Sequence, residues 1–365
     1  MVNSNLKMYK FLPTILFILI LISNLKVHAT PLVPCYFIFG DSLSDPGNNN
    51  ALKTKAKVNY KPYGIDYPAR RPTGRFTNGR TVVDIIAEHL GFKEHIAPYS
   101  TVNKNQILQG VNYASGSAGI SRETGSHLGD HVSLEAQMGN HIKITRRLKA
   151  TLNNTTNDYL TKCLYTINIG SNDYVNNYFL PKFYPTSRKY TPDYFAALLI
   201  QHYSKQLKTL HQYGARKVAV YGLGQIGCAL AELAKRPNGV VKHPLLGPCV
   251  KEINDAVNMF NAKLKLLIPQ LNRQLPNATF TIINTEAIFA GPGQGIKTVT
   301  KPCCKLREDY QCKEGIAPCN NRESYFFYDG FHPTEAVNKI TGAIAFKASS
   351  NFEAFPYDIS HLIKQ

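Results

Sequence analysis

Two short motifs, one near each end of the chain, carry the residue types needed for acyl transfer through a serine. In Gly40-Asp41-Ser42-Leu43, the serine follows an apolar run on a turn of small residues. In Asp329-Gly330-Phe331-His332, an aspartate stands three residues before a histidine. A serine hydroxyl becomes an effective nucleophile only when a base removes its proton, and an acid can orient that base. Ser42, His332 and Asp329 are therefore the predicted nucleophile, base and orienting acid.

Each of these residues also has an ordinary structural interpretation. A serine in a strand-to-helix turn commonly caps the helix, and an Asp-x-x-His pair can do the same. One other such pair occurs, Asp358 and His361, at the extreme C-terminus. Chain ends fray, so that position suits a rigidly held base poorly. His332 is thus the better candidate.

Two further turns offer donors for a developing oxyanion. Asn172 follows the apolar run 164–169, and its side-chain amide can donate a hydrogen bond. Gly116 follows the run 110–114, and a backbone N–H without a side chain beside it can approach a substrate closely. Asparagine and glycine are also common in turns for conformational reasons. Taken with the two motifs above, they favour a catalytic site.

Apolar runs typical of strands alternate with amphipathic runs typical of helices. The predicted strands are 36–39, 110–114, 164–169, 217–221 and 280–283, and the predicted helices are 81–90, 193–213, 250–271 and 334–348. This alternation predicts a parallel α/β sheet, in which ligands bind beyond the carboxyl ends of the strands. No repeat or convincing linker interrupts residues 30–365, so a single domain is predicted, with 291–321 as a disulfide-pinned excursion.

The first 29 residues have the features of a secretory signal peptide. Lys7 and Lys10 precede an apolar run at 11–22, and a small-residue cleavage site ends at Ala29. A signal anchor is the alternative interpretation. The sequons at Asn153, Asn154 and Asn277 are predicted glycosylation sites on a secreted surface.

Secretion permits disulfide bonds. Up to three bridges are expected among the cysteines in loop-like sequence, which are Cys228, Cys249, Cys303, Cys304, Cys312 and Cys319. Cys35 and Cys163 stand at the start of apolar runs and are expected to be small buried hydrophobes instead. Neither Cys-x-x-Cys nor His-Glu-x-x-His occurs, so neither a metal nor an organic cofactor is expected.

The chain is strongly basic, with a formal net charge of +18. Such a charge favours peripheral contact with acidic polymers or membrane surfaces. A solvated basic surface is the alternative, because the basic residues are scattered. No nucleic-acid motif accompanies them, so nucleic acid is not an expected partner.

The motifs together resemble those of plant GDSL-type esterases/lipases of the SGNH hydrolase superfamily. The nucleophile, glycine, asparagine and final blocks of that family are matched by residues 40–43, 112–119, 170–173 and 329–334, and 45–50 and 74–80 also look like family sequence. The resemblance runs from about residue 35 to residue 345. It implies a flavodoxin-like three-layer α/β/α sandwich with a central parallel sheet. It also implies a Ser42–Asp329–His332 triad, with the Ser42 N–H, the Gly116 N–H and the Asn172 side chain as oxyanion donors.

The function implied is that of a secreted serine ester hydrolase acting outside the cell or in the cell wall. A lipid, a cutin-like polyester and an acylated wall glycan are the substrate classes to consider. Pro46 and Gln225-Ile226 stand where many relatives have other residues. Both places are expected on the acyl or leaving-group side, so the resemblance does not predict the choice of substrate. An acyltransferase that uses the same acyl-enzyme and a catalytically weak protein that binds acyl groups or glycans are the alternatives.

Overall fold

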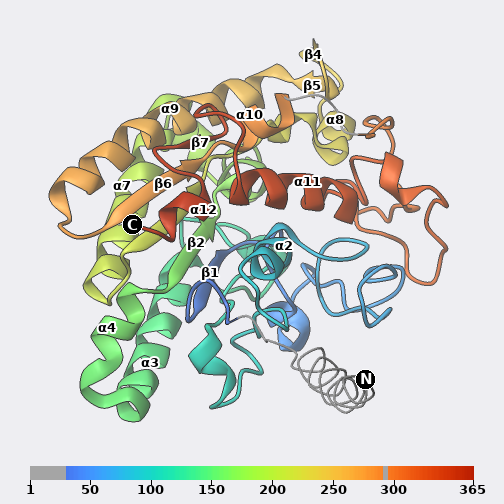
Figure 1. The fold of residues 1–365 in the computed structure, drawn as a ribbon. Helices are drawn as coiled ribbons and strands as arrows, with labels where there is room; N and C mark the ends of the chain where they lie inside the picture. The colour runs from blue at the N-terminus through green and yellow to red at the C-terminus, as the bar shows by residue number, and fades with distance from the viewer. Residues whose placement is uncertain (1–29, 291–294) are drawn as a thin grey trace, which may run out of the picture. The chain divides into compact units, whose positions relative to one another are not determined.

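The computed structural model describes residues 30–290 and 295–365 (Figure 1). The predicted signal peptide, residues 1–29, lies outside the described residues, as do positions 291–294 of the cysteine-rich excursion. No helix within the described ranges is long and apolar enough to cross a membrane. The fold described below is that of the unit Leu32–Gln365.

A five-stranded sheet in the order β1-β2-β3-β6-β7 lies at the centre of this unit. Its strands are β1 (Tyr36–Gly40), β2 (Leu164–Asn168), β3 (Lys217–Tyr221), β6 (Thr279–Ile283) and β7 (Ala354–Phe355). The first four run parallel to one another, and β7 is antiparallel to β6. The register places Gly40 opposite Asn168, so the loops that follow β1 and β2 leave the sheet side by side.

The predicted strand 110–114 is only partly a strand. Asn112 forms an isolated parallel bridge with Ile38 on the outer side of β1. The N–H groups of Tyr113 and Ser115 still donate to the carbonyls of Ile38 and Gly40. The ladder is incomplete because the Gly40 N–H donates to the side chain of Gln137 rather than to this segment. The segment nevertheless takes the position of an outer strand, which completes the 2-1-3-4-5 order of flavodoxin-like sheets.

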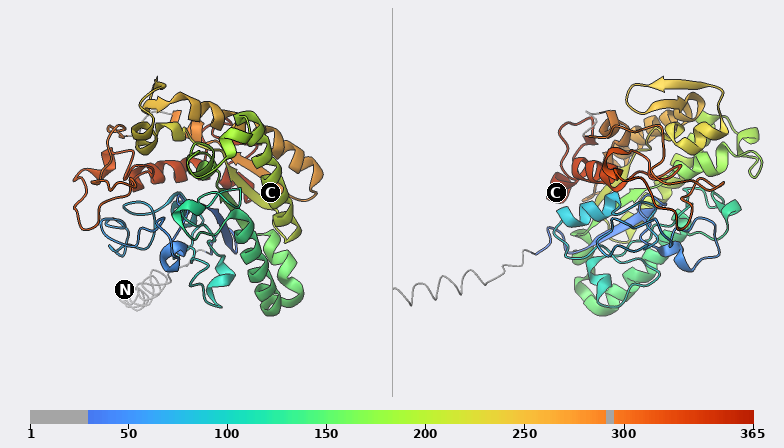
Figure 2. Two further views of the ribbon diagram at one scale, coloured as in Figure 1. Left: turned by 180° about the vertical axis from the view of Figure 1, so that it is seen from behind. Right: turned by 90° about the vertical axis from the view of Figure 1, so that its right-hand side faces the viewer.

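Helices cover both faces of the sheet. Alternate strand residues point to opposite faces, so Phe37 and Phe39 pack on one side and Tyr36 and Ile38 on the other. The first side carries α3 (Leu134–Leu152), α7 (Pro192–Gln212) and α9 (Lys251–Gln274), and the second carries α2 (Val82–His89), α11 (Glu335–Phe346) and α12 (Ile359–Leu362). Figure 1 views the α2 and α11 side, and the left view of Figure 2 shows the opposite side, with α3 in green. The arrangement is the predicted three-layer α/β/α sandwich.

Local sequence explains where the main helices begin. The hydroxyls of Thr191 and Thr334 accept N–H groups in the first turns of α7 and α11. Helix α3 escapes the sequence prediction because Gln137 and His141 occupy its buried stripe and weaken the apolar period. The remaining elements are α4 (Thr156–Thr161), α5 (Ser171–Asp173), α6 (Thr186–Lys189), α8 (Leu230–Lys235), α10 (Thr285–Ala290) and the hairpin of β4 (Val240–His243) and β5 (Gly247–Val250).

The disulfides confirm one expectation and overturn another. The six loop cysteines form three bridges, Cys228–Cys249, Cys303–Cys319 and Cys304–Cys312. Cys35 and Cys163 are fully buried, but their interpretation as unpaired hydrophobes is wrong, because they form a fourth disulfide. They directly precede the adjacent strands β1 and β2, and the register brings their Cα atoms to 4.8 Å. That adjacency is a tertiary feature, which spacing in the sequence does not reveal.

Candidate active site

Ser42 lies just beyond the carboxyl end of β1. The sheet pairing continues one residue past the strand, since the Asp41 N–H donates to the carbonyl of Asn168. A Cβ on Gly40 would lie 2.6 Å from that same carbonyl oxygen, so a residue without a side chain is needed there. The chain then turns and leaves Ser42 half-buried at the rim of the sheet.

The structure brings Ser42, His332 and Asp329 together in one line. The Nε2 atom of His332 lies 2.9 Å from Ser42 Oγ, and its Nδ1 atom lies 2.8 Å from Asp329 Oδ2. Asp329 is fully buried, and the N–H groups of Phe331 and His332 each donate to its Oδ1 at 2.8 Å. Burial alone would raise the pKa of Asp329, but the adjacent imidazole and these hydrogen bonds outweigh it and lower the pKa. The carboxylate is thus kept ionised and oriented.

The pair at the C-terminus shows which contact is distinctive. His361 Nδ1 also lies 2.8 Å from its aspartate, Asp358, which caps α12 by accepting the His361 N–H. His361 is exposed, and within the described chain its Nε2 has no hydrogen-bonded serine. The Asp-x-x-His spacing alone therefore produces a helix cap. His332 differs from His361 because its Nε2 atom contacts Ser42.

Asn172 lies at the start of the loop after β2, on the same cleft as Ser42 and His332. Its Oδ1 accepts a hydrogen bond from Asn176 at 2.6 Å, and its Nδ2 donates to the carbonyl of Ala118 at 3.0 Å. These contacts fix the orientation of the amide. One of its two N–H bonds is left over for another acceptor.

Gly116 does not join this cleft. Its N–H donates to the buried carboxylate of Asp45 at 2.9 Å, and its carbonyl accepts from Asn49 at 3.0 Å. Three residues on, the buried N–H of Gly119 makes no hydrogen bond within the described residues. It directly follows Ala118, whose carbonyl binds Asn172. The Ser117 N–H makes no hydrogen bond within the described residues either, and Ser117, unlike Gly119, lines the cleft. The glycine block therefore offers free backbone donors, but at Ser117 and Gly119 rather than at Gly116.

The block 45–50, which sequence reasoning left without a role, holds the glycine block in place through hydrogen bonds to its backbone. The Asp45 carboxylate accepts three backbone N–H groups, those of Gly47, Asn48 and Gly116. The amide of Asn48 donates to the carbonyls of Asn112 and Ala114 at 2.9 and 2.7 Å. The available sequence signal was the run of three asparagines at 48–50, shortly after Asp45. Amide side chains can both donate to and accept from backbone groups, so they suit the task of holding a loop.

Phe76 and Tyr63 were also missed, and both contact the site. The Phe76 ring lies 4.9 Å from the imidazole of His332 and lines the cleft. Tyr63 is fully buried, and its hydroxyl lies 2.7 Å from Asp329 Oδ2. Phe76 lies in the block 74–80, whose likeness to family sequence was the available signal, whereas Tyr63 carries no signal that distinguishes it from other core aromatics.

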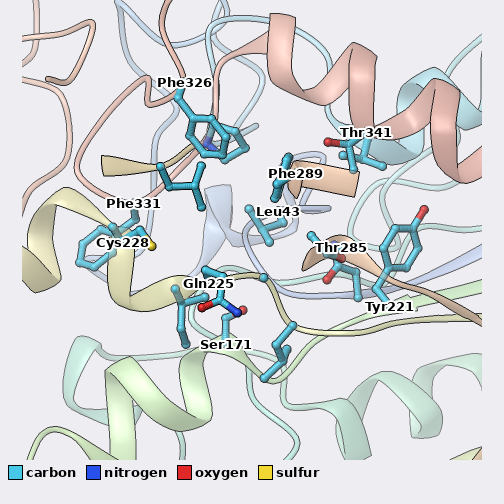
Figure 3. Close-up of a pocket in the computed structure, with 18 of the residues that line it drawn as sticks. Leu43, Ser171, Tyr221, Gln225, Cys228, Thr285, Phe289, Phe326, Phe331 and Thr341 are labelled. Atoms are coloured by element: carbon cyan, nitrogen blue, oxygen red, sulfur yellow. The ribbon is translucent and has the colours of Figure 1, made fainter. Parts of the chain in front are cut away.

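A second, mostly apolar cavity of about 110 Å³ lies beside the cleft, whose own volume is about 240 Å³. Leu43, Phe289 and Phe326 surround it (Figure 3), and Phe331 lines both spaces. Of the two departures from the family pattern, Gln225 and Ile226 line this cavity. Pro46 lines neither space, and its carbonyl accepts from the guanidinium of Arg75. Nowhere in residues 30–290 and 295–365 do three or more His, Cys, Asp or Glu side chains form a group that could hold a metal ion.

Comparison with known proteins identifies the family of the chain. The family described as GDSL-like lipase/acylhydrolase matches residues 36–344. Among Arabidopsis thaliana proteins, GDSL esterase/lipase At1g29670 is 45% identical over 93% of this chain and 94% of its own length. GDSL esterase/lipase At4g18970 is 45% identical, over 92% and 93%, and GDSL esterase/lipase At1g29660 is 44% identical, over 94% and 95%. The chain belongs to the GDSL lipase/acylhydrolase family.

Membership confirms the predicted family, its α/β fold and the ester hydrolase class. Residues 36–344 contain every motif quoted above. The GDSL sequence itself is residues 40–43, and the contact between His332 and Ser42 joins the first block of the family to the last.

Proposed function

We propose that this ester hydrolase acts through an acyl-enzyme on Ser42. His332 Nε2 takes the hydroxyl proton as Ser42 Oγ bonds to the ester carbonyl carbon. Collapse of the tetrahedral intermediate breaks the carbon–oxygen bond, and the alcohol leaves with that proton. Water, deprotonated by the same imidazole, then attacks the acyl-enzyme and releases the acid and Ser42. The 2.9 Å contact between Ser42 and His332 is the observation that carries the proposal.

The oxyanion would be held by donors that the fold leaves without other partners. The Ser42 N–H makes no hydrogen bond within the described residues, and Asn172 has one amide hydrogen to spare. Ser117 is proposed as the third donor, because its N–H is also unbonded within the described residues and the residue lines the cleft. Gly116, the donor expected from family resemblance, could serve only if its bond to Asp45 broke.

The two spaces beside Ser42 suit the two halves of an ester. The apolar cavity behind Leu43 and Phe331 would take the acyl group, and the cleft, which carries Lys235, Glu308 and Asp309, would take a polar alcohol. A cavity of about 150 Å³ holds benzene, so 110 Å³ corresponds to an acyl chain of about four carbons. Among the substrate classes considered, a short-acylated wall glycan fits these spaces better than a long-chain lipid or cutin-like polyester.

The proposed site of action is outside the cell or in the cell wall. Four disulfides are compatible with an oxidising compartment. Asn153, Asn154 and Asn277 are exposed, as glycosylation would require. The net charge of +18 would favour contact with acidic wall polymers.

The test compares the secreted wild type with Ser42→Ala on p-nitrophenyl esters from acetate to palmitate, and labels both with a serine-directed fluorophosphonate. Turnover and labelling that both disappear in the variant support the acyl-enzyme, and added alcohols that divert product into new esters would indicate acyl transfer. Labelling that persists at another residue in Ser42→Ala would refute the role of Ser42. A folded wild type that neither turns over nor labels would indicate a binding protein.

A further inference from the structure

The hydroxyl of Tyr63 makes two hydrogen bonds whose directions are fixed by chemistry. It lies 2.7 Å from Asp329 Oδ2 and 3.0 Å from the backbone nitrogen of Cys312. An N–H can only donate and a carboxylate can only accept. The hydroxyl therefore accepts from Cys312 and donates its single proton to Asp329. Burial and the nearby Asp329 charge raise the pKa of Tyr63 well above its usual value, so this donor stays protonated.

Asp329 Oδ2 consequently has two donors, the Tyr63 hydroxyl at 2.7 Å and His332 Nδ1 at 2.8 Å. The other oxygen, Oδ1, is occupied by backbone N–H groups. Tyr63 thus determines where Oδ2 lies and how much of its charge is directed at the imidazole. No other side chain besides His332 bonds this carboxylate in the described part of the chain.

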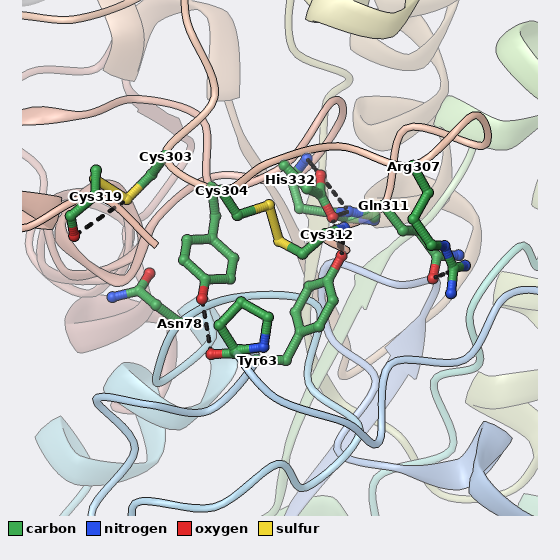
Figure 4. The surroundings of a disulfide bond; sticks show 12 residues. Tyr63, Asn78, Cys303, Cys304, Arg307, Gln311, Cys312, Cys319 and His332 are labelled. Atoms are coloured by element: carbon green, nitrogen blue, oxygen red, sulfur yellow. Dashed lines mark hydrogen bonds and ion pairs between the residues drawn. A yellow bond between two sulfur atoms is a disulfide. The ribbon is translucent and has the colours of Figure 1, made fainter. Parts of the chain in front are cut away.

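Tyr63 is itself held by the cysteine-rich excursion. The Cys304–Cys312 bridge closes the turn that presents the Cys312 N–H, and this disulfide packs in one buried cluster with Tyr63 and Tyr328. In Figure 4 the Tyr63 hydroxyl points toward Cys312, on the side where His332 lies. The rings of Tyr60 and Tyr328 meet the Tyr63 ring edge-on, at 5.4 and 5.6 Å. A disulfide-closed turn and an aromatic cluster therefore fix one hydroxyl.

We propose that Tyr63 is a positioning residue for the Asp329–His332 pair, and that the turn closed by Cys304–Cys312 acts on catalysis through it. This proposal rests on the proposed role of His332 as base. It gives the excursion a function in setting the orientation and charge of the carboxylate, beyond pinning a loop. At metal sites, residues that orient the ligands from outside commonly contribute about 10- to 100-fold to activity, and we expect an effect of the same order on this pair.

Tyr63→Phe removes the hydroxyl and keeps the ring. Tyr328→Phe is the matched control, because its hydroxyl is also buried in this cluster but donates to the carbonyl of Pro62 at 2.7 Å. We expect Tyr63→Phe to lower kcat about 10-fold or more, with KM within about twofold. The acid limb of its kcat/KM profile should move to higher pH, because Oδ2 then directs more negative charge at the imidazolium. Tyr328→Phe should leave the pH profile unchanged.

A double-mutant cycle separates action through Asp329 from general loosening. In an Asp329→Asn background, Tyr63→Phe should cost less than about twofold, because the carboxylate it orients is gone. An equal loss in both backgrounds, or a Tyr63→Phe enzyme with the wild-type kcat and pH profile, would overturn the proposal.

The turn supplies a second variant if Tyr63→Phe is recovered only unfolded. Cys304→Ala with Cys312→Ala keeps the backbone N–H but opens the turn, and it should show the same shift of the acid limb with a smaller loss of kcat. A folded double variant with a wild-type profile would reject the link to the disulfide. Loss of fluorophosphonate labelling in Ser42→Ala tests the proposed function separately, so the two hypotheses can fail independently.

Discussion

Gln137, in the first turn of α3, binds both backbone groups of Gly40, the last residue of β1. The Gly40 N–H donates to Gln137 Oε1 at 2.9 Å, and Gln137 Nε2 donates to the Gly40 carbonyl at 2.8 Å. Gln137 is fully buried. A polar side chain inside the core thus fixes the backbone two residues before the proposed nucleophile.

Replacing Gln137 by Ala should impair both stability and catalysis. The buried Gly40 N–H would lose its partner, at about 1–3 kcal/mol, whereas the Gly40 carbonyl would keep its bond from the Ser115 N–H. The Ser42 turn would also loosen. Thermal unfolding and kcat on a short p-nitrophenyl ester measure the two effects. Gln106, at an exposed turn, provides the matched Ala control, which should change neither. A Gln137→Ala enzyme of normal stability would show that the end of β1 keeps its conformation without these hydrogen bonds.

Asn172→Ala should lower kcat by about 100-fold or more, because it removes a proposed oxyanion donor. Asn176→Ala removes only the residue that binds Asn172 Oδ1, so a smaller loss is expected. Steady-state kinetics on one ester would compare them at saturating substrate. Equal losses would mean that orientation of the loop, rather than donation by Asn172, is what matters.

The buried carboxylate of Asp41 should make stability depend on pH. Burial raises its pKa to about 7, although the Leu43 N–H and His332 oppose the shift, whereas an unfolded aspartate titrates near 3.8. The folded state therefore binds the proton more tightly, and the stability from this group is lost as pH rises from about 4 through 7. Burial also raises the pKa of Asp45 and Asp173 to about 6, in the same direction.

Asp41→Asn removes this titration. Its stability relative to wild type should increase by about 2 kcal/mol between pH 5 and pH 8. Thermal unfolding at both pH values measures the change, with Asp158→Asn as the surface control. A difference that is the same at both pH values would mean that folded Asp41 is already ionised at pH 5.

Filling the apolar cavity should change chain-length preference. A Cβ at Gly224 would have Thr285 Cγ2 as its nearest neighbour, at an ordinary contact distance of 3.4 Å. Gly224→Val should therefore fold while taking space from the acyl chain, and kcat/KM should drop about 10-fold for butyrate and longer esters but little for acetate. Gly139→Val, on an open helix surface, is the control. A uniform loss across the series would place the acyl group elsewhere.

The sequence was sufficient to predict what depends on local pattern. The strands around Phe37 and Ile167 are apolar runs, the cap Thr334 precedes a periodic helix, and Asp329 and His332 are close because a three-residue spacing makes them so. The approach of Ser42 to His332 across 290 residues was expected from their residue types and from the family resemblance, because His332 precedes α11 and follows no strand of the central sheet.

What escaped prediction depends on tertiary packing. Polar residues inside the core, such as Gln137, resemble surface residues until their partners are known. The N–H of Gly116 is not free because it binds Asp45, which lies 71 residues away. Tyr63 is one aromatic residue among many, and only the placement of Asp329 against it, 266 residues away, makes it distinct.

The Cys35–Cys163 bridge has a consequence for how the chain is made. Its two sulfurs are separated by 128 residues, and Cys35 emerges from the ribosome long before its partner. Until residue 163 has been synthesised, the first strand carries an unpaired thiol and lacks the neighbour that completes its pairing. The nascent chain must therefore be kept from oxidising with the wrong partner during synthesis. Production in a host with thiol–disulfide isomerases should determine the yield of correctly paired protein more than any later refolding step.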